Sequence, residues 1–141
     1  MLRSNLLHPE ILEALGSGGH GTKVMIADGN FPFATKAGPN ARIVFLNLCP
    51  GCLTVPEVLK VIVAEVPIEA ANVIMPESGV LPPIVQEFQS IIGSRPKIEP
   101  LDRFGFYDAV RSDDCGLVIA TGEQRIFACI LLTIGVIPPP E

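Results

Sequence analysis

The sequence predicts an α/β fold: one domain over residues 1–141, with three layers (α/β/α) around a mostly parallel sheet. Two observations support this prediction. The apolar runs are unbroken and rich in β-branched residues, as in strands that are buried on both faces, and segments with helical patterning separate them. A chain of 141 residues is also long enough to bury the core of one such domain.

Several segments have the start and stop signals of helices. Pro9 stands at a first helical position with an acidic residue beside it, and glycines 16 and 18 follow the segment. Thr54 and Asp102 are capping residues that precede two further segments, and Gly93 closes another whose apolar side chains share one face. The expected helices are Pro9–Leu15, Pro56–Val63, Pro83–Ile92 and Phe104–Arg111.

The strands are expected where short apolar runs lie between these helices. Glycine and proline punctuate the chain into short elements, and no repeat or low-complexity linker divides it. The expected strands are Val24–Ala27, Ile43–Leu46, Asn72–Met75, Gly116–Ala120 and Ile126–Ile134.

Composition restricts the partners and the location of the protein. Hydrophobic residues make up 48% and the mean hydropathy is +0.45, so we expect a homo-oligomer in which some apolar side chains lie between subunits. The longest apolar run, Phe127–Ile137, is shorter than the roughly 20 residues of a bilayer span, which argues against a membrane protein. The net charge of −5 argues against nucleic acid as a partner. The N-terminus has no secretory signal pattern, and the expected location is cytoplasmic.

The motif Cys49-Pro50-Gly51-Cys52 follows a predicted strand and precedes a predicted helix. This is the local context of a thioredoxin-type redox pair, although the chain has no Trp to precede the motif. No second Cys-x-x-Cys motif exists that would complete a zinc site, so we expect no metal. The sequence favours structural or incidental thiols, with a dithiol oxidoreductase as the alternative.

An imidazole and a carboxylate stand where a core would not place them. His20 lies between Gly19 and Gly21, and Asp28 ends a short apolar strand. An accessible imidazole can donate or accept a proton near neutral pH. The alternative is that His20 is a solvated loop residue and Asp28 a turn residue.

Five motifs in order carry a family resemblance. They are Gly19-His20-Gly21, Ala27-Asp28-Gly29-Asn30-Phe31-Pro32, Asp102-Arg103-Phe104-Gly105-Phe106-Tyr107-Asp108, Thr121-Gly122-Glu123, and Ile130-Leu131-Leu132 before Gly135-Val136. Together they resemble the fucose mutarotase and ribose pyranase family (RbsD/FucU), over nearly the whole chain. The Asn-Phe-Pro and Arg-Phe-x-Phe-Tyr elements are similar to the fucose mutarotase branch.

The resemblance implies an enzyme that interconverts anomers or ring forms of a free monosaccharide without a cofactor. It also implies a homo-oligomer, a decamer of two stacked rings in bacterial members, with the sugar bound near subunit boundaries. His20 matches the catalytic histidine, Asp28 and Arg103 match sugar-binding positions, and Tyr107 matches a tyrosine in or near the site.

At three further sugar-binding positions this chain has Phe127, Ala128 and Cys129, where the family usually has Tyr, a small residue and Asn. Phe127 lacks a hydroxyl and Cys129 lacks an amide, and a site that loses such partners loses selectivity for its sugar. The alternative within this fold is therefore a non-catalytic monosaccharide-binding protein.

Ring opening requires one group to take the proton of the anomeric hydroxyl while another protonates the ring oxygen. His20 is the candidate for one transfer and Tyr107 for the second, while Asp28 and Arg103 would hold the sugar. A strand from Lys23 to Ala27 spans about 16 Å, so His20 and Asp28 leave its opposite ends. We therefore hypothesise that one subunit supplies His20 and its neighbour supplies part of the remaining site.

Overall fold

Six strands form one mixed sheet in the computed structural model, which describes residues 1–141. Their order across the sheet is β2-β5-β1-β6-β3-β4. The strands are β1 (Lys23–Ala27), β2 (Arg42–Phe45), β3 (Ile68–Ile74), β4 (Ile98–Leu101), β5 (Cys115–Ala120) and β6 (Ile130–Ile134).

Only β6 runs against its neighbours. It pairs antiparallel with β1 and with β3, whereas β1–β5, β2–β5 and β3–β4 are parallel pairs. The prediction of a mostly parallel sheet is therefore confirmed. The carboxyl ends of five strands and the beginning of β6 lie at one edge of the sheet, which is the edge where open α/β folds bind ligands.

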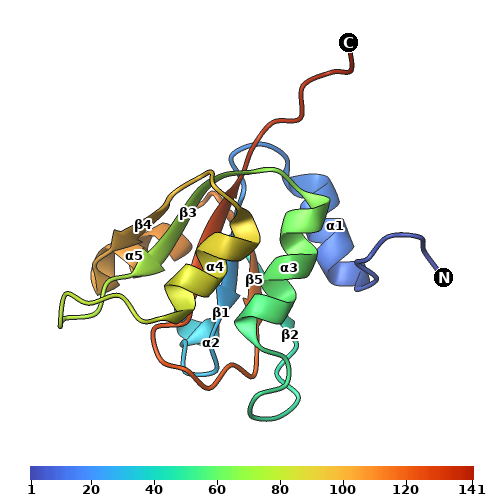
Figure 1. The fold of residues 1–141 in the computed structure, drawn as a ribbon. Coiled ribbons are helices and arrows are strands. Elements are labelled where there is room, and N and C mark those ends of the chain that lie inside the picture. Colours follow the sequence, from blue (N-terminus) through green and yellow to red (C-terminus); the bar gives the residue numbers. More distant parts are fainter.

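Helices cover both faces of the sheet, which confirms the predicted three layers (Figure 1). The helices α1 (Pro9–Gly18), α3 (Val55–Glu65) and α4 (Ile84–Ile92) pack over one face, where Leu59, Ile62 and Phe88 are fully buried. On the other face, α5 (Arg103–Val110) buries Phe106 and Val110 against Met25 and Val118 of the sheet. The unbroken apolar strands follow from this burial on both sides.

The helix starts follow the capping residues. The Asp102 side chain accepts a hydrogen bond from the Gly105 amide at 2.8 Å, which begins α5. Thr54 and Glu57 form a capping box at the start of α3, since the Thr54 amide donates to the Glu57 carboxylate at 2.8 Å. Asp102 thereby fixes the start of the helix that carries Arg103 and Tyr107.

Several element boundaries differ from the prediction. Helix α1 continues through Gly16 to Gly18, because the backbone leaves the helical conformation only at Gly19, where φ is +74°. Strand β6 begins at Ile130 and not at 126, because residues 126–129 form a loop in which Phe127 has φ +54°.

Two short elements were not expected, α2 (Phe33–Lys36) and β4. Each has only four residues. Strand β4 also contains Pro100, which is tolerated because β4 is an edge strand. None of the helices combines the length and the apolar character of a membrane span. Beyond β6 the C-terminal segment extends away from the body (Figure 1).

Candidate functional site

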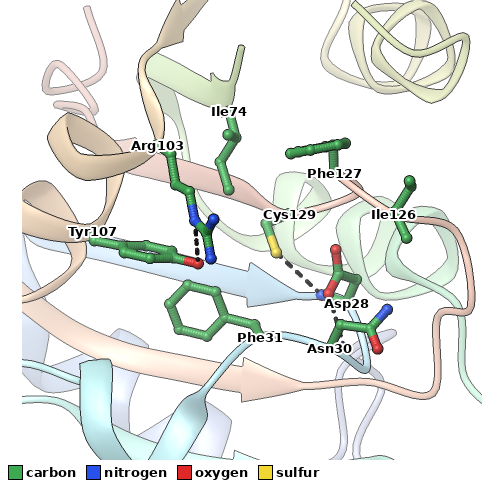
Figure 2. Close-up of a pocket in the computed structure, with 9 residues that line it drawn as sticks. All are labelled: Asp28, Asn30, Phe31, Ile74, Arg103, Tyr107, Ile126, Phe127 and Cys129. Carbon is green, nitrogen blue, oxygen red and sulfur yellow. Dashed lines mark hydrogen bonds between the residues drawn. The ribbon is translucent and has the colours of Figure 1, made fainter. Parts of the chain in front are cut away.

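A cavity of about 260 Å³ opens at the edge of the sheet where β1 and β3 end and β6 begins (Figure 2). Its walls combine polar side chains with an apolar lining. The lining residues are Asp28, Asn30, Phe31, Ile74, Arg103, Tyr107, Ile126, Phe127 and Cys129.

Asp28 is a buried carboxylate, only 4% exposed, directly after β1. One carboxylate oxygen, Oδ1, accepts from the Asn30 amide at 3.0 Å, and Oδ2 accepts from the Ala128 amide at 3.1 Å. The two backbone donors fix the carboxylate and offset part of the cost of burying it. Each oxygen keeps a free lone pair, so the carboxylate can accept hydrogen bonds from a ligand in the cavity.

The segment after β5 supports the turn that carries Asp28. The Thr121 hydroxyl donates to the Ala27 carbonyl at 2.7 Å, and the Gly29 amide donates to the Glu123 carbonyl at 2.9 Å. A side chain at position 29 would approach that carbonyl to 3.1 Å, which explains why glycine follows the aspartate. The turn after β1 is thus built against the end of β5.

Glu123 is a second buried carboxylate, and it anchors the loop that leads to β6. It is 3% exposed and accepts from the Arg125 Nε at 2.9 Å, from Arg125 Nη2 at 2.8 Å and from the Val55 amide at 3.3 Å. The hydrogen bonds from the Arg125 side chain hold the pKa of Glu123 below its ordinary value. Arg125 also reaches Glu87 on α4 at 3.1 Å, so the loop is tied to two helices.

Arg103 and Tyr107 lie one helical turn apart on α5 and project into the cavity from the opposite wall (Figure 2). Arg103 Nε donates to the Tyr107 hydroxyl at 3.3 Å, and this bond raises the pKa of Arg103. The Tyr107 ring packs edge-on against Phe31, with 5.6 Å between ring centroids. None of the ion pairs in the structure involves Arg103, so its remaining N–H groups are available to a ligand.

The loop before β6 brings three of the predicted positions to the cavity in different ways. Phe127 contributes its ring, from a backbone conformation that bulky residues rarely adopt, with φ +54°. Ala128 contributes its backbone amide, which is committed to Asp28.

Cys129 is buried, and its sulfur accepts from the Asp28 amide at 3.4 Å (Figure 2). Burial, and after it the Asp28 carboxylate, raises the pKa of the Cys129 thiol well above its ordinary value. Cys129 is therefore a neutral thiol that positions Asp28 as well as lining the cavity.

Four lining residues were not predicted as site residues: Asn30, Phe31, Ile74 and Ile126. Asn30 and Phe31 directly follow Asp28, and Ile126 directly precedes Phe127, so their neighbours in the chain were a signal. Ile74 ends β3 at the same sheet edge.

His20 lies at the opposite edge of the sheet from this cavity. It precedes β1, whereas Asp28 follows it, and five strand residues separate the two sites. The His20 Nε2 atom lies 2.9 Å and 3.1 Å from the two carboxylate oxygens of Glu69, near the start of β3. Within one chain, the structure thus brings Asp28, Arg103, Tyr107, Phe127 and Cys129 together and leaves His20 apart.

The structure contains no group of three or more His, Cys, Asp and Glu side chains that could hold a metal ion. Cys49 and Cys52 are free thiols in a turn of their own. Helix α3 begins three residues after Cys52, so its N-terminus does not activate these thiols as the thioredoxin-type interpretation requires.

The family model for the RbsD / FucU transport protein family matches residues 1–137. The chain belongs to this family. The match spans both sheet edges, from the helix before His20 to the strand after Cys129. The resemblance given by the five motifs is therefore confirmed.

Members of the RbsD/FucU family with names and structures are similar over their whole length. The fucose mutarotase of Danio rerio is 32% identical, over 97% of this chain and 94% of its own. The fucose mutarotase of Streptococcus pneumoniae, whose structure is in complex with L-fucose, is 28% identical, with a TM-score of 0.78 over 93% of this chain and 94% of its own. Bacillus subtilis RbsD, in complex with D-ribose, is 25% identical, with a TM-score of 0.82 over 98% of this chain and 100% of its own.

Proposed function

We propose that this protein is a monosaccharide mutarotase that interconverts the anomers, or the pyranose and furanose forms, of a free sugar without a cofactor. The sugar we propose is L-fucose or a related aldose. The observation that carries the proposal is a fixed, buried Asp28 carboxylate and an unpaired Arg103 guanidinium that line one cavity. The names of the relatives support it.

The cavity suits a single sugar ring. Its volume of about 260 Å³ lies just below the roughly 300–1,000 Å³ of sites for drug-sized ligands. A sugar hydroxyl both donates and accepts, and the cavity offers an acceptor at Asp28, donors at Arg103 and an amide at Asn30. This set can hold several hydroxyls of one ring at once.

The apolar wall favours a sugar with an apolar substituent. Ile74 and Phe127 provide carbon surface without a hydrogen-bonding side chain. A 6-deoxy sugar such as L-fucose can bury its methyl group there, whereas a C6 hydroxyl would lose water without gaining a partner. We therefore expect 6-deoxy sugars to be preferred over their 6-hydroxy counterparts.

Ring opening moves two protons, and this chain has a candidate for each. Tyr107 receives a hydrogen bond from Arg103, so its own hydroxyl proton is free to be donated to the ring oxygen. The Arg103 charge would then stabilise the phenolate that forms. His20 would take the proton of the anomeric hydroxyl, and both transfers reverse on ring closure.

His20 serves this cavity only if it comes from a neighbouring subunit. Its contact with Glu69 supports the role, since a carboxylate that accepts from Nε2–H leaves Nδ1 unprotonated and able to act as a base. We propose a cytoplasmic homo-oligomer, a decamer of two stacked rings, in which His20 of one chain faces the cavity of the next.

The test is saturation transfer between the anomeric protons of L-fucose in NMR. The protein should accelerate the exchange, and His20→Ala should abolish it while the fold is retained. The matched control is His8→Asn, because His8 is the other histidine and its capping bond to the Ile11 amide can be kept by asparagine. Sugar binding without exchange would support the non-catalytic alternative, and neither binding nor exchange would overturn both.

A further inference from the structure

Cys49-Pro50-Gly51-Cys52 forms a tight turn that the proposed mutarotase reaction does not use. The Cys52 amide donates to the Cys49 carbonyl at 2.9 Å, and the Cys49 amide donates back at 3.5 Å. Gly51 has φ +81°, which the third position of a type II turn requires, and proline suits the second position. The residues between the cysteines thus set the geometry of the turn.

We propose that Cys49 and Cys52 are a modification site that closes reversibly into an intramolecular disulfide. Residues that face each other as a hydrogen-bonded antiparallel pair have Cα atoms about 5.5 Å apart, within the roughly 4.4–6.8 Å that a disulfide spans. Both thiols are free, Cys49 is exposed and Cys52 is half-buried.

The reduced turn is held in place by the protein around it. The Gly51 amide donates to the Gly122 carbonyl at 2.6 Å, and the Gly122 amide donates to the Leu53 carbonyl at 2.9 Å. Any side chain at position 122 would overlap the Cys49 carbonyl, so the turn lies directly on the segment after β5. Closing the disulfide therefore needs little reorganisation of the backbone.

The remaining possibilities for a thiol pair fit the structure less well. A metal site would need a third ligand, and no such group exists. A redox catalyst would need an activated thiol, whereas partial burial and the neighbouring Cys49 raise the pKa of Cys52. A thiol pair that closes reversibly into a disulfide needs only two thiols close together and one of them accessible to the oxidant.

The oxidant we name is a small-molecule disulfide such as oxidised glutathione. The exposed Cys49, as its thiolate, attacks one sulfur of that disulfide, and one glutathione thiolate leaves. Cys52, as its thiolate, then attacks the Cys49 sulfur of the mixed disulfide and releases the second glutathione. Two protein thiols are oxidised, one glutathione disulfide is reduced to two thiols, and the two protein protons go to solvent or to the leaving thiolates.

The experiment equilibrates the full chain in glutathione redox buffers, followed by acid quench, alkylation and mass spectrometry of peptides. We expect a loss of two hydrogen atoms on the peptide that holds Cys49 and Cys52, with Cys115 and Cys129 unmodified because they are buried. The fold already fixes a turn residue that is free to move in the unfolded chain. The equilibrium constant for closing the Cys49–Cys52 disulfide should therefore be about 5- to 30-fold larger in the native chain than in the urea-unfolded chain.

The variants Cys49→Ser and Cys52→Ser serve as controls and should each prevent the loss of two hydrogen atoms. A native chain that remains a dithiol in fully oxidised glutathione would overturn the proposal. So would a native equilibrium constant no larger than the unfolded one, or a persistent mixed disulfide at Cys49.

Discussion

The substitution Asp28→Asn separates the structural and the binding roles of the buried carboxylate. It keeps the size of the side chain but replaces one acceptor oxygen with a donor NH₂ group. In the structure, both oxygens accept backbone hydrogen bonds, one from Asn30 and one from Ala128. An amide can satisfy only one of these two donors.

The expected loss of stability depends on which donor is abandoned. Ala128 is fully buried and Asn30 is exposed, so the amide oxygen should turn to the Ala128 N–H and leave the Asn30 N–H to water. Asp28→Asn should therefore lower the free energy of unfolding by about 1–2 kcal/mol, near the lower end of the cost of an unsatisfied buried donor. In the proposed reaction, loss of a charged hydrogen bond to a sugar hydroxyl costs about 1.5–3 kcal/mol, or about 10- to 150-fold in kcat/KM.

Urea unfolding and the anomer-exchange assay measure the two effects on the same sample. The matched control is Asp108→Asn on α5, because Asp108 is exposed and its side chain makes no hydrogen bond in the structure. We expect the control to match the parent in both assays. An Asp28→Asn protein with the parent's kcat/KM would refute the placement of the sugar against this carboxylate.

Three further predictions concern the groups around the two sheet edges. Phe127→Tyr should lower the KM for the sugar by about 2- to 10-fold, since it restores a neutral hydrogen-bonding group, whereas Phe104→Tyr, outside the cavity, should leave KM unchanged. Glu69→Gln should reduce the rate of anomer exchange by no more than about fivefold, because the pair with His20 is exposed. It should also alter the ring tautomer of His20 in ¹⁵N NMR, and an unchanged tautomer would contradict the role of Glu69 in positioning His20. The pKa of Glu123 is held below its ordinary value of 4.5, so its contribution to stability is present above that pH and is lost as the pH falls through the lower folded value. In urea unfolding over this acid range, the free energy of unfolding should therefore fall more steeply with decreasing pH for the parent than for Glu123→Gln. The control Glu99→Gln changes an exposed residue and should behave as the parent does.

The fold could be predicted where burial leaves a pattern in the sequence. Strands β1 and β5 are covered on both faces, so their unbroken apolar runs reveal a central position in a parallel sheet. The direction of β6 left no such pattern, because an apolar run reads the same for a parallel and an antiparallel strand. The edge strand β4 was missed because it has only four residues and contains proline.

The candidate site could be predicted in part, for a similar reason. Asp28 is a carboxylate at the end of a predicted strand, where a core has no use for it, whereas Arg103 was predicted from its place in a family motif. Ile74, in contrast, is an apolar residue that also ends a strand, and nothing in its sequence context separates a cavity wall from a core. Ala128 acts through its backbone amide, which no side-chain pattern can reveal.

The separation of His20 from Asp28 is enforced by the sheet. Strand β1 is hydrogen-bonded on both sides, to β5 and β6, so it cannot shorten. The Gly21 amide donates to the Ile134 carbonyl at 2.9 Å, which holds the residue after His20 at the far edge. Ile126, which lines the cavity, is 64% exposed and offers an apolar surface that a neighbouring chain would cover.

A mixing experiment decides whether the proposed reaction uses two chains. His20→Ala and Asp28→Ala should each be inactive as pure oligomers. If a site takes His20 from one subunit and Asp28 from the next, random mixed oligomers contain intact sites in about one quarter of positions, and about that fraction of the parent's exchange rate should return. A site formed within one chain has no intact copy in any mixture, so activity that stays at the level of the pure variants would contradict the shared site. Since β1, which spans about 16 Å, separates the two groups in each chain, recovery on mixing is the expected result.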